Sequence, residues 1–91
     1  MFKSNTGRKF RSDLDKAQKQ RKNIAELKEV MDKLCKEIPL EPKYKDHPLK
    51  GNWIGRRECH LAPDWLLIYQ IRDDEKAIYF ERLGSHSDLF S

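Results

Sequence analysis

The chain has 91 residues, of which 37% are hydrophobic and 37% are charged, and 19 Lys and Arg against 15 Asp and Glu give it a formal net charge of +4. This length supports one small core, so we expect residues 1–91 to form a single domain, and the clustering of the apolar residues argues against disorder. No run approaches the ~20 apolar residues that span a bilayer, and the first residues are not followed by the apolar core of a signal peptide. The sequence therefore predicts a cytoplasmic protein with no membrane partner.

The basic charge is concentrated in the first half, because more than half of the Lys and Arg residues precede Pro39. Such a surface favours an anionic partner, either a nucleic acid or an acidic protein segment. The two cysteines, Cys35 and Cys59, form no CxxC motif and fall in unrelated segments. We expect both to be reduced and to pack as small apolar side chains.

Two helices are predicted before Pro39. The first runs from about Thr6 to Arg21, with a basic exterior and a narrow apolar stripe. Asn23 offers an N-cap to the second, with Glu26 three residues on as in a capping box, and the second stripe continues to Pro39. The stripe residues are Phe10, Leu14 and Ala17 in the first helix and Ile24, Leu27, Met31, Leu34 and Ile38 in the second. The short break between the helices predicts an antiparallel helical hairpin.

The second half predicts strands. Pro39–Arg56 is rich in proline and glycine but holds several large apolar residues, so we expect a packed loop. Three strands follow, at Arg57–Leu61, Trp65–Arg72 and Ala77–Leu83. Gly84-Ser85 ends the last strand, and Ser85 can cap a helical turn over His86–Phe90. The predicted fold is α+β, with the helical hairpin on one face of a small antiparallel sheet of three to four strands, the fourth being an N-terminal edge strand that begins near Phe2.

Strand alternation brings polar groups to the other face of this sheet. Glu58 and His60 share one face of the first strand and Cys59 takes the opposite one, so we expect Cys59 in the core and His60 on the open face. Asp64 lies in the turn that leaves this strand, and the break at Gly84-Ser85 returns His86 toward the same end. In the last strand, alternation puts Ile78, Phe80 and Arg82 on one face, although pattern alone does not say which face is inward. We expect Arg82 beside His60.

Each of these residues also has a structural interpretation, as a surface histidine, an ion-paired arginine or a turn aspartate. Zinc is disfavoured, because Cys59 and His60 point to opposite faces and no pair has tetrahedral ligand spacing. A nucleophilic hydrolase would need a nucleophile elbow or an activated thiol, and the chain offers neither. The hypothesis that remains is acid/base chemistry on an anionic substrate, with no metal and no cofactor.

Three separated motifs occur in order: YKDHPL at 44–49, HLAPDW at 60–65 and RLGSHSDLF at 82–90. In combination they resemble the YafQ-type branch of the RelE/ParE toxin superfamily, and the resemblance extends from the first predicted helix to the end of the chain. The N-terminus departs from the family's pattern, because it leaves little room for a first strand. That departure bears on the number of strands and not on the site.

The resemblance implies a toxin of a bacterial toxin–antitoxin pair, an endoribonuclease that cuts mRNA in the ribosomal A site. The implied partners are an acidic antitoxin and the ribosome with its mRNA. By motif position, the expected catalytic residues are His47, His60, Asp64, Arg82 and His86, and the expected supporting substrate contacts are Trp65 and Phe90. Histidine can transfer protons near neutral pH, and the planar arginine side chain can bind phosphate oxygens.

Two hypotheses from other classes stay open at this point. The first is a gyrase-inhibiting toxin of the related ParE branch, which would bind a protein on the same fold. The second is a basic RNA-binding module without catalysis. Neither function requires three histidines that converge.

Overall fold

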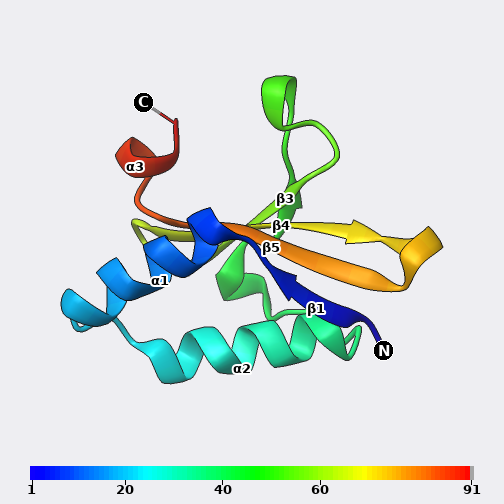
Figure 1. The fold of residues 1–91 in the computed structure, drawn as a ribbon, viewed down its shortest axis with the longest axis horizontal. Coiled ribbons are helices and arrows are strands. Elements are labelled where there is room, and N and C mark those ends of the chain that lie inside the picture. The colour runs from blue at the N-terminus through cyan, green and yellow to red at the C-terminus, as the bar shows by residue number, and fades with distance from the viewer. Residues whose placement is uncertain (91) are drawn as a thin grey trace.

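The computed structural model describes residues 1–90 and folds them into one sheet with helices on both of its faces (Figure 1). The elements are β1 (Lys3–Thr6), α1 (Arg8–Lys19), α2 (Ile24–Cys35), β2 (His47–Pro48), β3 (Arg57–Ala62), β4 (Trp65–Arg72), β5 (Ala77–Gly84) and α3 (His86–Phe90). Three short 3₁₀ turns accompany them: η1 (Pro42–Tyr44), η2 (Gly51–Trp53) and η3 (Asp73–Glu75). Within the described part of the chain, no helix has the length and apolar character required to cross a membrane.

The sheet has five strands in the order β1-β5-β4-β3-β2, with β1 parallel to β5 and the other neighbours antiparallel. The α+β class is confirmed, but the expectation of three to four antiparallel strands is wrong. The expected N-terminal edge strand is β1, a fully exposed KSNT segment that pairs parallel to β5 and not antiparallel. The fifth strand is β2, which has two residues, one of them a proline. An edge strand is held by backbone hydrogen bonds on one side, so it needs no alternating apolar pattern that a sequence could reveal.

The helices α1 and α2 lie on one face of the sheet and enclose the main core (Figure 1). Both are shorter than expected. Asn23 accepts a hydrogen bond from the backbone N–H of Glu26, which confirms the predicted cap. After Cys35 the helix ends, and Glu37 adopts a positive φ of 60°, so Ile38 lies beyond the helix and is 45% exposed. The fully buried side chains of this core include Phe10, Leu27, Val30, Cys59, Leu67, Tyr69, Ile78 and Phe80.

A second, smaller apolar cluster covers part of the opposite face. Leu66, Ile68 and Leu89 form it, and Leu49 and Trp53 pack against it. The strand β4 is therefore buried on both faces, which explains its unbroken apolar run. The loop before β3 contributes to both clusters, since Tyr44 lies in the main core and Leu49 and Trp53 pack against the smaller one. This confirms the prediction of a packed loop. Cys35 and Cys59 are free thiols, as expected.

A β-bulge in β5 decides which face Arg82 occupies. Ile68 pairs with Arg82, but the next residue, Tyr69, pairs with Phe80, so Glu81 is the extra residue. An extra residue reverses the alternation that follows it. Arg82 therefore shares the open face with Ile68, whereas Phe80 is buried against the helices. The expectation that Phe80 and Arg82 share a face is wrong for this reason.

Candidate active site

The centre of the open face is a carboxylate between two imidazoles. His47 on β2 pairs with Glu58 on β3, and His60 follows two residues later on the same face. The Oε2 atom of Glu58 lies 3.2 Å from Nε2 of His47 and 3.5 Å from Nε2 of His60. The Glu58 side chain is only 6% exposed, and its other oxygen, Oε1, is buried without a hydrogen-bond partner among the described residues. A buried carboxylate with one unsatisfied oxygen is costly, so this arrangement points to a functional role.

Glu58 was not among the residues that we predicted for the site. The alternation of side chains placed it on the same face as His60, but a glutamate in a strand is most often solvated. The signal that could have identified it is the pairing of β2 with β3, and β2 is too short to predict.

The cost of burying Glu58 can be measured. Glu58→Leu should raise the free energy of unfolding by about 1–3 kcal/mol, because it removes an unsatisfied buried carboxylate oxygen and adds apolar contact. Urea denaturation monitored by circular dichroism would give this value, with Glu58→Gln as the control that keeps the shape and the polarity. A lower midpoint for Glu58→Leu than for the wild type would show that the two histidines stabilise the carboxylate by more than its burial costs.

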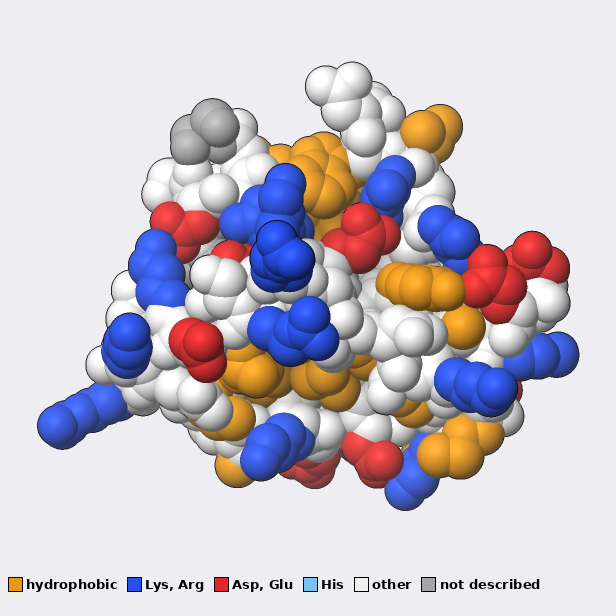
Figure 2. All heavy atoms as spheres, viewed as in Figure 1, with side chains coloured by type: hydrophobic (Ala, Val, Ile, Leu, Met, Phe, Trp, Pro, Cys, Tyr) orange, Lys and Arg blue, Asp and Glu red, His pale blue; other side chains and the backbone are white. Residues whose placement is uncertain are grey.

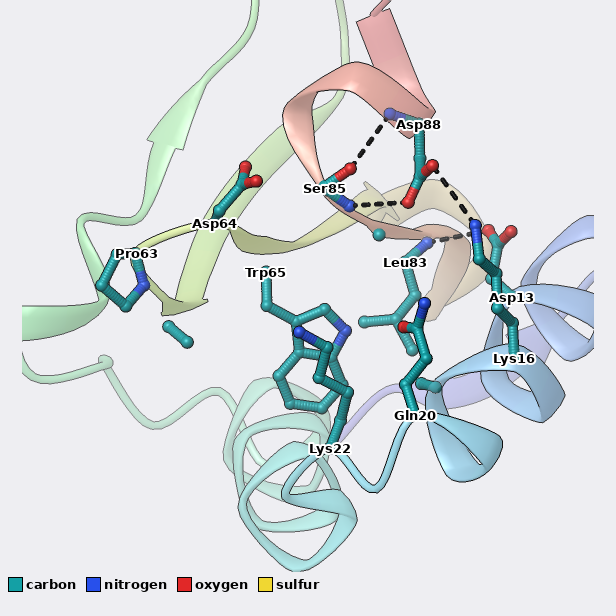
Figure 3. Close-up of a pocket in the computed structure, with 13 residues that line it drawn as sticks. Asp13, Lys16, Gln20, Lys22, Pro63, Asp64, Trp65, Leu83, Ser85 and Asp88 are labelled. Atoms are coloured by element: carbon teal, nitrogen blue, oxygen red, sulfur yellow. Dashed lines mark hydrogen bonds and ion pairs between the residues drawn. The ribbon is translucent and has the colours of Figure 1, made fainter.

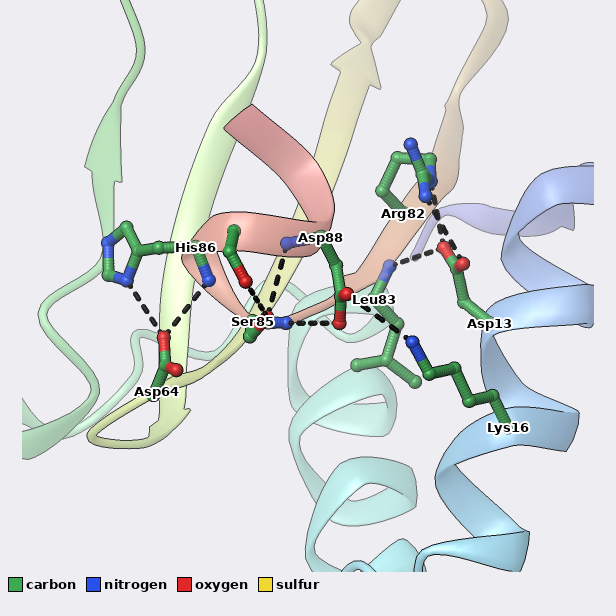
Figure 4. A network of polar contacts seen from close by, with 9 residues as sticks. Asp13, Lys16, Asp64, Arg82, Leu83, Ser85, His86 and Asp88 are labelled. Atoms are coloured by element: carbon green, nitrogen blue, oxygen red, sulfur yellow. Dashed lines mark hydrogen bonds and ion pairs between the residues drawn. The ribbon is translucent and has the colours of Figure 1, made fainter. Parts of the chain in front are cut away.

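The third histidine is attached to the turn between β3 and β4 (Figure 4). Asp64 in this turn accepts a hydrogen bond of 3.0 Å from the backbone N–H of His86, and the same oxygen lies 3.1 Å from Nδ1 of the His86 ring. These two contacts, the backbone contact first, lower the pKa of Asp64. A lowered pKa means that the anion holds α3 at neutral pH and releases it only as the pH falls through that lowered value.

Ser85 caps α3, as the sequence predicted. Its Oγ accepts from the backbone N–H of Asp88 at 3.1 Å, and its own N–H donates to the Asp88 carboxylate at 3.2 Å. Asp88 also pairs with Lys16 of α1 at 3.3 Å. The short helix is thus fixed on two sides, and with it the position of His86.

The aromatic rings of the site follow one another in a row. The ring centroids of His47 and His60 are 6.0 Å apart, as are those of His60 and His86. The Phe90 ring lies 6.1 Å from that of His86 and meets the edge of Trp53 at 5.6 Å. The three histidines therefore converge on the open face. The alternation and turn arguments predicted this for His60 and His86, whereas His47 was expected in the site only from the family resemblance.

Arg82 shares this face but does not lie beside His60. The strand order places β4 between β3 and β5, and Arg82 pairs instead with Asp13 of α1. Its Nε donates to Asp13 at 2.8 Å and its Nη2 at 3.3 Å, while the N–H of Leu83 donates to the same carboxylate at 2.9 Å (Figure 4). The hydrogen bonds to Asp13 raise the pKa of Arg82, which remains a cation. The expectation of direct contact with His60 is wrong because only neighbouring strands bring side chains together.

Trp65 and Phe90, the two expected substrate contacts, have different environments. Trp65 is 3% exposed and belongs to the core on the helix side, so it supports the turn that carries Asp64. Phe90 is 42% exposed at the edge of the site. Of the two rings, only that of Phe90 is exposed enough for a nucleobase to stack on it.

A cavity of about 590 Å³ adjoins the site at Asp64 (Figure 3). It lies between the second half of α1, the β3–β4 turn and the start of α3. Lys16, Gln20 and Lys22 line one side, and Trp65 lies between Gln20 and Pro63.

One group of side chains has the donor set of a metal site. The ligand atoms of His47, Glu58 and His60 lie within 4.8 Å of one another. Two imidazole nitrogens and a carboxylate suit a transition-metal cation. The sequence argument against metal considered Cys59 with His60 and did not foresee that β2 would bring His47 to Glu58.

A sheet with two helices on one face and a row of histidines on the other defines a small α+β toxin of the kind that the three motifs indicate. The chain belongs to the YafQ family: the family model described as a bacterial toxin of type II toxin–antitoxin systems, YafQ, matches residues 2–91.

Known proteins agree with this assignment. The mRNA interferase toxin YafQ of Escherichia coli strain K12 is 45% identical over 82 residues, which cover 89% of this chain and 87% of that protein. A metal-bound toxin from Helicobacter pylori superposes with a TM-score of 0.94 at 49% identity, over 99% of this chain and 100% of that one. YafQ in the E. coli DinJ–YafQ complex superposes with a TM-score of 0.91 at 40% identity over the whole of both chains.

Proposed function

We propose that this toxin is a ribosome-dependent endoribonuclease that cleaves mRNA in the ribosomal A site by acid/base catalysis without a metal ion. Endoribonuclease activity follows from the family, whose curated members from E. coli are named mRNA interferases. The observation that carries the mechanism is the row of three imidazoles, with carboxylates at Glu58 and Asp64 beside it.

Cleavage of RNA without a metal requires two proton transfers. The 2′-hydroxyl must lose a proton as it attacks the adjacent phosphorus, and the departing 5′-oxygen must gain one. Imidazole side chains can perform both steps, and rings about 6 Å apart can reach the two oxygens on either side of one phosphate. We assign these transfers to His47, His60 and His86 as a group.

Two charged residues complete the proposed mechanism. Asp64 holds the His86 ring through Nδ1, so Nε2 is directed away from the carboxylate and toward the substrate. Arg82 uses Nε and Nη2 to hold Asp13, and its remaining Nη1 donors are available for the phosphate oxygens as they gain charge.

The shape of the site supports ribosome dependence. The histidines lie on an open sheet face, and such a surface cannot by itself hold a flexible RNA in the in-line geometry that proton transfer needs. We expect programmed ribosomes to accelerate cleavage by on the order of 10²-fold or more over naked RNA, because misplacement by about 1 Å already costs this factor. Mapping of mRNA ends after incubation with each substrate tests this expectation, and equal rates on the two substrates would refute it.

Metal independence has its own test. The H. pylori relative is metal-bound, and His47, Glu58 and His60 of this chain have a metal-ligating donor set. A cation bound to these residues would occupy imidazoles that the mechanism uses for proton transfer. Chelation of the toxin before it is added to ribosomes should therefore leave cleavage intact or increase it. Loss of cleavage on chelation of the toxin alone would reverse this part of the proposal.

The proposed partner in the cell is an acidic antitoxin that folds on the basic toxin and covers or distorts the site. The DinJ–YafQ complexes support this proposal, since they pair a related toxin with another chain. Co-expression with the product of an adjacent gene should restore growth and yield a complex on size exclusion. A gyrase inhibitor or a non-catalytic RNA-binding protein would need no convergent imidazoles, so the geometry favours the nuclease over both.

A further inference from the structure

A second cavity, about 370 Å³ in volume, opens between the start of α1 and the part of β4 and β5 around Gln70 and Tyr79. Four cationic side chains from three segments line it, with one carboxylate among them: Arg8 and Lys9 of α1, Arg56 before β3, Arg72 of β4, and Glu81 of the β5 bulge. Figure 2 shows several Lys and Arg side chains over the middle of the molecule, with Asp and Glu side chains between them. The lining therefore carries a net charge of +3, from four cations and one anion.

The cations differ in how they are engaged. Arg56 pairs with Glu81 at 3.1 Å, and Arg72 pairs with Glu75 at 3.2 Å. Arg8 and Lys9 are exposed and make no ion pair within residues 1–90. Their charges are therefore free to pair with a bound anion.

Part of the cavity lies on the same sheet face as the histidines, and the start of α1 lines it from the β1–β5 edge of the sheet. Along β4, Leu66 pairs with His60, and Gln70, which lines the cavity, points to the same face four residues later. At about 3.3 Å per residue the two positions are about 13 Å apart. Arg82, opposite Ile68, lies between them. An RNA strand that crosses the histidines can thus continue over Arg82 into the basic cavity.

The aromatic ring of Tyr79 favours an RNA strand over an acidic peptide as the ligand of this cavity. Tyr79 lines the cavity, half-buried, and the Arg72 guanidinium lies 4.8 Å from its ring centroid. Cationic side chains beside an aromatic ring are typical of surfaces that track a nucleic-acid backbone. We propose that this cavity binds a backbone phosphate of RNA while the histidines act on the A-site codon. The inference rests on the proposed nuclease function and adds to it a docking site outside the catalytic row.

The test uses the double variant Arg8→Gln/Lys9→Gln, since both side chains are exposed and neither holds the fold together. The matched control is Lys19→Gln/Lys28→Gln, which removes the same charge from exposed positions on α1 and α2 away from the cavity. Binding to programmed ribosomes and single-turnover cleavage are measured for both between about 50 and 200 mM salt, the range over which phosphate binding changes affinity most visibly. Counterion release predicts that affinity at physiological salt falls about fivefold for each phosphate that the variant no longer binds, with a salt slope flatter by about 1. Cleavage at saturating toxin should not change.

Two further arms identify the source of the phosphate. Ribosomes programmed with an mRNA that carries neutral methylphosphonate linkages beside the A-site codon should weaken wild-type binding, and not that of the variant, if the phosphate belongs to mRNA. Ribosomes without mRNA should show the same difference in affinity between the wild type and the variant if the phosphate belongs to ribosomal RNA.

If the variant binds ribosomes like the control, the inference is overturned. A variant that loses affinity only for the antitoxin would overturn it in favour of an acidic peptide. A wild type that binds ribosomes without cleaving mRNA would instead overturn the proposed function, and the binding comparison would still decide the inference.

Discussion

His86→Ala should lower the rate of mRNA cleavage on programmed ribosomes by about 10²–10⁴-fold, which corresponds to about 3–5 kcal/mol of transition-state stabilisation. Its melting temperature should stay close to that of the wild type. The reason is that the His86 ring is 55% exposed and contacts an aspartate that is 66% exposed, so its removal leaves no buried group unpaired. The Asp64 carboxylate also keeps its hydrogen bond to the backbone N–H of residue 86. Single-turnover cleavage and a thermal melt of the same protein would separate catalysis from folding.

Asp64→Ala should also slow cleavage, because it releases both the ring and the backbone of His86. Asp74→Ala is the matched control, since Asp74 is likewise an exposed aspartate in a turn between strands, but lies at the other end of β4. Both variants should retain antitoxin binding. A folded His86→Ala protein that cleaves at the wild-type rate would remove α3 from the catalytic site.

The parts of this fold that the sequence predicted are those that bury one face or both. The helix stripes and the apolar runs of β3, β4 and β5 exist because water is excluded there, and burial leaves a periodic pattern. The edge strands β1 and β2 bury almost nothing. Their backbone hydrogen bonds leave no trace in the side chains, so the order of the sheet could not be completed from the sequence.

The site was predictable where it depended on local geometry. His60 follows from strand alternation, Asp64 from a turn and His86 from a strand end. Contacts between distant segments were not predictable. Glu58 contacts His47 only because β2 pairs with β3. Arg82 lies on the open face because of a bulge at Glu81, which the sequence pattern did not predict.

Arg82→Gln should lower kcat for ribosome-dependent cleavage by about 10²–10³, the usual effect of removing one preorganised donor from a site where negative charge develops. Stability should fall as well, by about 1–3 kcal/mol, because Asp13 is 15% exposed and loses its cationic partner. Arg82→Lys keeps the charge without the planar fork and should recover only part of the rate. Cleavage at saturating ribosomes together with urea denaturation would report both quantities.

The partner Asp13 separates the two roles of this arginine. Asp13→Asn can still accept the hydrogen bond from the N–H of Leu83 through its amide oxygen, and it leaves the guanidinium free to turn toward the substrate. We therefore expect Asp13→Asn to lose stability but to keep most of its cleavage rate, whereas Arg82→Gln loses both. If Asp13→Asn is as inactive as Arg82→Gln, then the ion pair with α1 positions the guanidinium for catalysis. An arginine that acts only with its carboxylate partner is held in place by that partner and does not bind phosphate as a free cation.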